Sequence, residues 1–185
     1  MRRRIHAVIF DRDGTLIKHV PYLQDPEQVS LLPGARLVIE KLRQAGILLF
    51  IHTNQSGIGR GMFSQEAALL CNQRLIELLD FDGEPFTNIC IAPETPEDPP
   101  LYRKPSPKFA LEIMREHNLH PSTLCYVGDR GSDLATAAVS GTRAIGVTTG
   151  LDDLSRELKE QGLFDRFPIV SSLEEALPIL LGLQT

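Results

Sequence analysis

Residues 7–16 read Ala7-Val-Ile-Phe-Asp-Arg-Asp-Gly-Thr-Leu16, an apolar run that leads directly into two acidic residues and indicates the class of fold. Such a run is typical of a buried strand in a parallel sheet, and Gly14 lets the backbone turn away after it. Asp11 and Asp13 are therefore expected at the carboxyl end of a strand, where open parallel sheets bind ligands. Two carboxylates one residue apart can hold a divalent cation or divide the roles of nucleophile and general acid.

Composition places the chain among ordinary globular proteins. Its 185 residues, 42% hydrophobic and 23% charged, suit a single domain over 1–185 with a sizeable core. Three cysteines without a CxxC pair argue against a disulfide frame and favour the reducing cytoplasm. The net charge of −5 counts against nucleic-acid binding, and we interpret Arg2-Arg3-Arg4 as a solvated terminus. We expect neither a signal peptide nor a membrane partner.

Short apolar runs alternate with amphipathic stretches along the chain, the pattern of an α/β protein with helices on both faces of a parallel sheet. The predicted strands are 7–10, 47–52, 88–91, 124–127, 143–147 and 169–170. The predicted helices are 33–45, 64–80, 107–117, 131–140, 151–161 and 173–181. Two irregular segments, 18–32 and the proline-rich 94–102, are too short for a separate cap domain. We expect the first to act as a flap over a site.

Polar motifs follow three further strands. Residues 52–61, HTNQSGIGRG, offer hydroxyl, amide and backbone N–H donors that can cradle a phosphate. A glycine-rich connector without a binding role is the alternative interpretation of this segment. Arg103 and Lys104 stand just before a helix. Asp129 ends the fourth predicted strand, and Asp133 follows one helical turn later, on the same face. Motifs in this order on successive strand ends predict one shared site.

As a set, these motifs resemble those of the haloacid dehalogenase-like (HAD) phosphohydrolases, subfamily IIIA. The branch that they resemble most contains histidinol-phosphate and heptose-bisphosphate phosphatases. The matching strings are DRDGTL, HTNQSGIGRG, YRKP and VGDRGSD, within about residues 5–150. The resemblance implies a Rossmann-like HAD fold without a large cap domain. It also implies a Mg²⁺-dependent phosphatase of carbohydrate metabolism, acting on a small metabolite such as a heptose bisphosphate or histidinol phosphate.

The resemblance also implies catalytic roles. Asp11 would be the nucleophile that forms an aspartyl-phosphate, and Asp13 the acid that protonates the leaving oxygen and then activates water. One Mg²⁺ would bind between Asp11, the main-chain carbonyl of Asp13, and Asp129. Lys104 would neutralise the remaining phosphate charge, and Thr53 would hydrogen-bond the phosphate oxygens.

Other positions receive supporting roles by the same resemblance. Asp133 would support the metal site and Thr15 would brace the turn. The residues predicted to bind substrate are Asn54, Arg103 and Arg130, since arginine makes bidentate contacts with phosphate. The branch often carries a zinc ion in the loop before the RKP motif. Here Cys90 is followed by neither Cys nor His through residue 102, so we expect no structural zinc and a loop held by prolines.

Two other functions compete with this interpretation. Thr53-Asn54-Gln55 and Leu101 to Pro105 also resemble polynucleotide kinase phosphatase domains, which suggests a polynucleotide 3′-phosphatase with a groove lined by Arg2–Arg4 and Arg60. The acidic balance and scarce aromatic residues count against it. A non-catalytic binding protein is the third reading, although every motif acid and the lysine are present. Among the histidines, we expect His52 to pack into the sheet and His19 to reach substrate.

Overall fold

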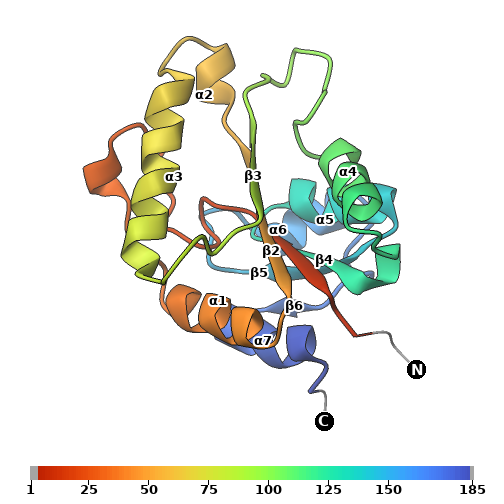
Figure 1. Ribbon diagram of the computed structural model, residues 1–185. Helices are drawn as coiled ribbons and strands as arrows, with labels where there is room; N and C mark the ends of the chain where they lie inside the picture. The colour runs from red at the N-terminus through yellow and green to blue at the C-terminus, as the bar shows by residue number, and fades with distance from the viewer. Residues whose placement is uncertain (1–3, 184–185) are drawn as a thin grey trace.

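A six-stranded sheet forms the centre of the computed structural model, which describes residues 4–183 (Figure 1). The strand order is β3-β2-β1-β4-β5-β6, and each neighbouring pair is parallel. The strands are β1 (Ala7–Phe10), β2 (Leu48–Asn54), β3 (Asn88–Ala92), β4 (Leu124–Gly128), β5 (Arg143–Val147) and β6 (Ile169–Val170). The predicted parallel sheet is confirmed.

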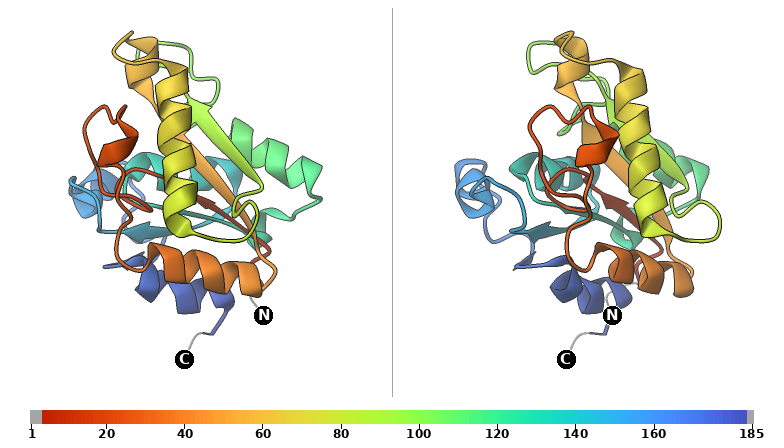
Figure 2. Two further views of the ribbon diagram at one scale, coloured as in Figure 1. Left: turned by 60° about the vertical axis from the view of Figure 1, so that its left-hand side comes forward. Right: turned by 90° about the vertical axis from the view of Figure 1, so that its left-hand side faces the viewer.

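Helices cover both faces of the sheet, as predicted (Figure 2). They are α1 (Ala35–Gln44), α2 (Ser56–Gly59), α3 (Gln65–Leu79), α4 (Lys108–Glu116), α5 (Gly131–Ser140), α6 (Leu154–Glu160) and α7 (Leu173–Leu181). Two 3₁₀ turns, η1 (Pro26–Gln28) and η2 (Pro121–Thr123), complete the assignment. Apolar side chains of α1, α3 and α7 share one core, and those of α4, α5 and α6 share the other. Within the described residues, no helix has the length and apolar character needed to cross a membrane.

Strand β1 shows why its apolar run is continuous. Val8 and Phe10 belong to the core beneath α1, α3 and α7, whereas Ala7 and Ile9 belong to the opposite core. All four side chains are fully buried. A central strand with both faces covered needs apolar residues at every position, because its side chains alternate between two cores.

Some boundaries differ from the prediction. Strand β2 runs to Asn54 instead of ending at His52, and the short helix α2, which the sequence analysis missed, follows directly. Its Ser-Gly-Ile-Gly sequence has weak helix propensity, so tertiary contacts decide its formation. Helix α6 starts at Leu154 instead of residue 151, because the Asp153 side chain accepts the N–H of Arg156 and caps it there.

The topology brings the ends of β1 and β4 together. From β1 the chain continues to β2 and β3 on one side, and later returns to place β4 on the other side of β1. The two strands are in register, with Phe10 opposite Val127, so the residues that follow each lie side by side. This reversal of strand order creates the crevice in which open α/β sheets bind ligands.

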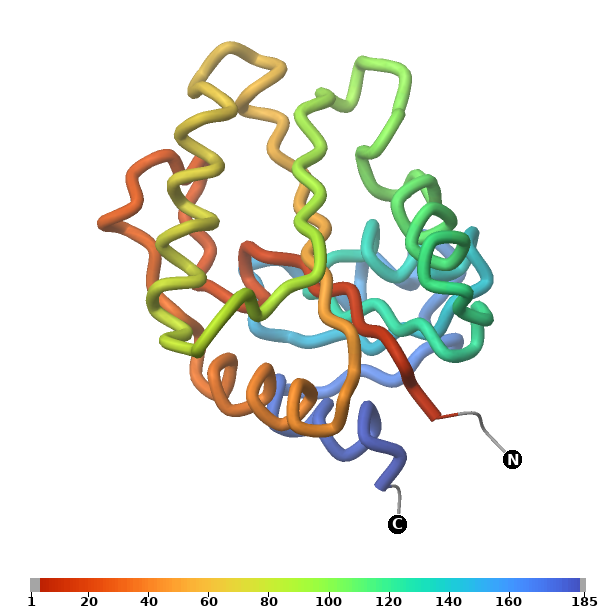
Figure 3. The backbone as a smooth tube through the Cα atoms, viewed as in Figure 1, coloured from red at the N-terminus to blue at the C-terminus, as the bar shows by residue number. Residues whose placement is uncertain are grey.

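Two segments leave this carboxyl end of the sheet on different sides (Figure 3). We call residues 18–32 the flap and residues 94–102 the proline-rich loop. The flap is anchored by a bridge between Ile17 and Leu31, and Leu23 and Val29 are buried in the core that contains α1.

Candidate active site

A cavity of about 410 Å³ opens at the carboxyl ends of β1, β2 and β4. Flap residues 19–23 line one side of it, so the predicted placement of the flap is confirmed and His19 reaches the cavity. Most of the predicted site residues also line it: Asp11, Asp13, Thr53, Asn54, Arg103, Lys104, Asp129 and Arg130. The other two, Thr15 and Asp133, are fully buried and bond to lining residues.

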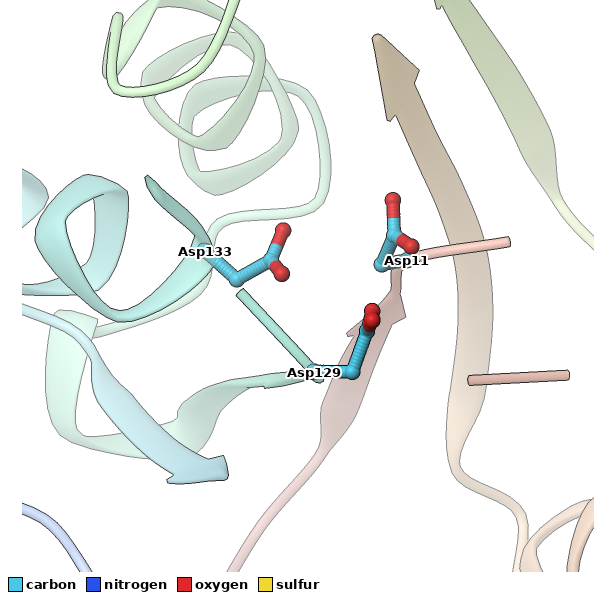
Figure 4. A group of neighbouring side chains, drawn as sticks. All are labelled: Asp11, Asp129 and Asp133. Carbon is cyan, nitrogen blue, oxygen red and sulfur yellow. The ribbon is translucent and has the colours of Figure 1, made fainter. Parts of the chain in front are cut away.

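Three buried carboxylates meet at the floor of the cavity (Figure 4). Asp11 follows β1, Asp129 follows β4, and Asp133 lies in the first turn of α5, with ligand oxygens all within 4.8 Å of one another. Burial, with the charges of neighbouring acids, raises the pKa of Asp11 to about 6 and that of Asp129 to about 8. Such a concentration of negative charge and hard oxygen donors fits a divalent cation such as Mg²⁺.

Lys104 supplies a fixed positive charge beside these acids. Its Nζ lies 2.5 Å from Oδ1 of Asp11 and 2.5 Å from Oδ1 of Asp133. Burial acts to lower the pKa of Lys104, but the charges of the two carboxylates outweigh it and raise the pKa. The lysine therefore stays cationic next to the predicted nucleophile, where it can neutralise an incoming phosphate.

The relation between Asp129 and Asp133 differs from the one predicted. Helix α5 begins only at Gly131, so helical spacing does not place the two acids on one face. Instead, Oδ2 of Asp133 accepts the backbone N–H of Arg130 at 3.0 Å, while Oδ1 binds Lys104. Because both of its oxygens are engaged, Asp133 is better placed to hold the lysine than to bind a metal.

Asp13 is held by three side chains, two of which the sequence analysis did not single out. Its Oδ2 accepts from Arg12 Nε and Gln55 Nε2, each at 2.9 Å, and from Thr53 Oγ1 at 3.3 Å. Arg12 is fully buried, and its Nη1 donates to Oδ1 of Asn72 in α3 at 2.8 Å. The position of Arg12 between two acids and that of Gln55 beside Thr53 were signals in the sequence, whereas Asn72 carried none.

Thr15 and Gly14 act on Asp129. The Thr15 hydroxyl donates to Oδ1 of Asp129 at 3.1 Å, so the threonine orients this acid across the crevice. Gly14 has a φ of 87°, and a Cβ at this position would collide with the Asp129 carboxylate. Glycine is therefore required by the backbone conformation and by this close approach.

The predicted substrate-binding residues differ in the hydrogen bonds and ion pairs that their side chains already make within the protein. Both ends of the Asn54 amide bond the main chain of Lys104. The Arg130 guanidinium pairs with Asp152 at 2.5 Å and Glu157 at 3.0 Å. Arg103 donates one Nη1 bond, 3.2 Å long, to the main-chain oxygen of Glu94 at the cavity wall.

Other residues considered in the sequence lie away from the cavity. Arg2 and Arg3 lie outside the described residues, and Arg4 bonds the carbonyl of Ala45, which precedes β2 at the amino end of the sheet. Arg4 therefore does not line a groove at the site, which corrects that part of the nucleic-acid hypothesis. His52 is buried in the sheet as predicted. All three cysteines are free, and those at 71 and 125 are buried.

Comparisons with known proteins agree with this geometry. The model of a family described as HAD-hydrolase-like matches residues 101–176. The chain is 29% identical to the D-glycero-β-D-manno-heptose-1,7-bisphosphate 7-phosphatase of Pasteurella multocida, covering 97% of this chain and 98% of that one. It is 31% identical to the probable D-glycero-D-manno-heptose-1,7-bisphosphate 7-phosphatase of Thermoplasma volcanium, covering 67% and 85%.

A solved structure is similar along nearly the whole chain. The D,D-heptose 1,7-bisphosphate phosphatase from B. bronchiseptica, complexed with magnesium and phosphate, matches with a TM-score of 0.86 and 28% identity, covering 97% of this chain and 100% of that one. The resemblance inferred from the motifs is thus confirmed. This chain belongs to the HAD-like hydrolases, in the branch that contains the heptose-bisphosphate and histidinol-phosphate phosphatases.

Proposed function

We propose that this protein is a Mg²⁺-dependent phosphatase that hydrolyses a phosphomonoester of heptose 1,7-bisphosphate. The observation that carries the proposal is the contact between Lys104 and Asp11 beside two further buried acids, at the floor of a cavity. A carboxylate nucleophile next to a fixed cation suits attack on a phosphate dianion. The names of the relatives from Pasteurella multocida and B. bronchiseptica supply the substrate class.

The donor set fits magnesium. Asp11, Asp129 and the main-chain carbonyl of Asp13 would hold the ion, and their oxygens are ligands that Mg²⁺ prefers. When bound, Mg²⁺ supplies positive charge that reduces repulsion between the nucleophile and the phosphate and stabilises the transition state. The raised pKa values of Asp11 and Asp129 indicate how strongly their charged forms need such compensation.

The chain's own residues then divide the reaction into two displacements. An oxygen of Asp11 attacks phosphorus, the bond to the sugar oxygen breaks, and Asp13 gives its proton to that oxygen. In the second step Asp13 takes a proton from water, which attacks phosphorus, releases inorganic phosphate and regenerates Asp11. Thr53 and Gln55 hold the Asp13 carboxylate at the cavity for both proton transfers.

The walls suggest how a second phosphate is recognised. Arg130 already pairs with two carboxylates, whereas Arg103 makes its described bond to a neutral carbonyl. Arg103 is therefore the better candidate for a bidentate contact with the phosphate that is not cleaved. A cytoplasmic location belongs to this proposal, because free cysteines and a metabolic substrate both suit a reducing compartment.

Phosphate release from a panel of substrates tests the proposal. Heptose 1,7-bisphosphate, histidinol phosphate and a 3′-phosphorylated oligonucleotide should be compared with Mg²⁺ and with EDTA, for the wild type and Asp11→Asn. We expect Mg²⁺-dependent release from the heptose bisphosphate, absent in the variant. A preference for histidinol phosphate or for the oligonucleotide would identify that compound as the substrate in place of the heptose bisphosphate. Inactivity towards all three would favour a non-catalytic binding protein.

A further inference from the structure

Arg103 and Lys104, the two cationic side chains of the cavity, directly follow Tyr102. The backbone N–H and the carbonyl oxygen of Tyr102 are both hydrogen-bonded to side chains. We propose that Glu94 and His52 are positioning residues, which fix the backbone of Tyr102 and thereby set where Arg103 meets the substrate. We call these two side chains, with the backbone of Leu101 and Tyr102, the Tyr102 clasp. The inference rests on the proposed function, in which Arg103 binds the second phosphate.

Glu94 holds the first side of the clasp. Its Oε1 accepts the N–H of Leu101 at 3.1 Å and the N–H of Tyr102 at 2.6 Å, which closes the proline-rich loop on itself. Its main-chain oxygen accepts the bond from Arg103. Its Oε2 is buried without a hydrogen-bond partner among residues 4–183. Desolvating a carboxylate oxygen is unfavourable, so the charge-assisted bonds through Oε1 must offset it.

His52 holds the second side. It is fully buried on β2, and its Nε2 lies 2.8 Å from the carbonyl oxygen of Tyr102, while Nδ1 lies 3.1 Å from the hydroxyl of Tyr126. A carbonyl can only accept, so Nε2 carries the hydrogen and Nδ1 accepts from Tyr126. Burial, with the charge of Lys104, lowers the pKa of His52 to about 3, so the ring stays neutral in this tautomer.

Asn54, two residues after His52 on β2, holds the backbone of Lys104 in a similar way. Asn54 Oδ1 accepts the N–H of Lys104 at 2.9 Å, and its Nδ2 donates to the Lys104 carbonyl at 3.3 Å. His52 and Asn54 point to the same side of β2 because side chains alternate along a strand. Tyr102 and Lys104 are thus each bonded at N–H and C=O, and Arg103 lies between them.

This arrangement fixes the register of residues 102–104 against β2. The Lys104 side chain enters the floor beside Asp11, and Arg103 lines the wall of the cavity. A slip by one residue would bring Arg103 to the position of Lys104, or Lys104 to that of Arg103, and would displace the other cation from the cavity. Weakening the clasp should therefore impair recognition through Arg103 more than chemistry at Asp11, because Asn54 and two carboxylates still hold Lys104.

Steady-state kinetics with two substrates can test this. We compare KM and kcat for heptose 1,7-bisphosphate and for p-nitrophenyl phosphate, which lacks a second phosphate. Glu94→Ala should raise KM for the bisphosphate about tenfold, as expected for a misplaced ion contact, and KM for p-nitrophenyl phosphate less than about threefold. Glu94→Gln retains an accepting oxygen and should restore most of the difference. Glu97→Ala, which removes the same charge from an exposed position of the same loop, is the matched control.

His52 is tested in the same way. His52→Phe keeps a buried ring but removes the donor to Tyr102, so KM for the bisphosphate should again rise selectively. His52→Gln supplies a side-chain N–H and should partly rescue it. Melting temperatures of all variants identify any that are unfolded, and the two glutamine variants then carry the comparison.

A double-mutant cycle tests whether Glu94 acts by positioning Arg103 or by stabilising the site in general. If the clasp acts through Arg103, adding Glu94→Ala to Arg103→Met should raise KM for the bisphosphate no further than Arg103→Met alone. Additive effects, equal losses on both substrates, or an unchanged KM in Glu94→Ala would each overturn the inference.

Failure of the proposed function would look different, because the wild type itself would release no phosphate from heptose 1,7-bisphosphate. Amide hydrogen exchange would then judge the clasp directly. Faster exchange at the Tyr102 amide in Glu94→Ala, with exchange in β1 unchanged, would support the clasp, and unchanged exchange at Tyr102 would overturn it.

Discussion

The floor of the cavity and the loops that form its walls are stabilised in different ways. Asp11, Asp133 and Lys104 are buried charges fixed by strand ends, a helix start and one another. The flap is fixed by apolar side chains, and the proline-rich loop by backbone N–H groups that donate hydrogen bonds to a few carboxylates. Because the floor and the walls are stabilised independently, mutations can alter chemistry and recognition separately in this molecule.

The two walls also differ from each other. The flap buries Leu23 and Val29 and pairs its ends through backbone bonds such as Lys18 N–H to the Ser30 carbonyl, 2.9 Å long. The proline-rich loop relies on Glu94 and on Asp98, whose carboxylate accepts from the backbone and hydroxyl of Thr95. Sequence changes should therefore reposition the second wall more easily than the first.

Replacing the two adjacent cations gives the largest expected contrast. Lys104→Met removes the charge beside Asp11 and should lower kcat by about 10²–10³-fold, the range found when one preorganised stabilising group is lost. Arg103→Met changes the wall and should mainly raise KM for a bisphosphate. Kinetics of both variants on heptose 1,7-bisphosphate test this, and similar kcat losses in both would contradict a division between floor and wall.

The acids of the floor should also make stability depend on pH when Mg²⁺ is absent. Burial and neighbouring acids raise the pKa of Asp129 from 3.8 to about 8. A carboxyl with a higher pKa in the folded state stabilises the fold fully below its unfolded pKa, and this contribution disappears as pH rises through the folded pKa. The contribution of Asp129 should therefore decline from about pH 4 to about pH 8, and the metal-free melting temperature should fall across the upper part of this window, between about pH 6 and pH 8.

Two comparisons sharpen this pH prediction. Asp129→Asn removes the titrating group, so its melting temperature should change less across the same interval. Mg²⁺ competes with protons for the carboxylates and should stabilise the wild type more at the higher pH. Thermal melts with and without Mg²⁺ measure both effects. An equally steep decline in Asp129→Asn would remove Asp129 as the cause.

Within the flap, the buried contact should matter more than the exposed one. Leu23 is 2% exposed, and Leu23→Ala should lower the free energy of unfolding by about 2–4 kcal/mol through lost packing. Its neighbour Tyr22 is 46% exposed, so Tyr22→Ala should change the free energy of unfolding by less than about 0.5 kcal/mol. Chemical denaturation compares the pair, and equal losses would show that apolar burial does not anchor the flap.

The smallest effect is expected in the proline-rich loop. Asp98 is exposed and accepts both of its bonds from Thr95, so Asp98→Ala should leave the melting temperature within about 2 °C of the wild type. Activity on p-nitrophenyl phosphate should also be retained. A large fall in melting temperature would mean that this turn, and not the Glu94 contact, holds the loop.

Much of the fold could be predicted because its signals are local. The apolar run 7–10, the pattern at 143–147 and the glycine after Ser140 give β1, β5 and the end of α5 as observed. The short helix α2 was missed, since a Ser-Gly-Ile-Gly segment has little helical propensity of its own. The acids after β1 and β4 were expected at one edge because parallel strands share their carboxyl ends.

Local sequence patterns were enough to predict which residues follow each strand, and so which charges form the floor. Long-range packing, by contrast, places Arg12 against Asn72, 60 positions away, and His52 against Tyr102 across 50 positions. Strand and helix signals depend on neighbours along the chain, whereas these contacts depend on how α3 and the proline-rich loop pack against the sheet. Distances of that kind are set by side-chain packing, which local periodicity does not specify.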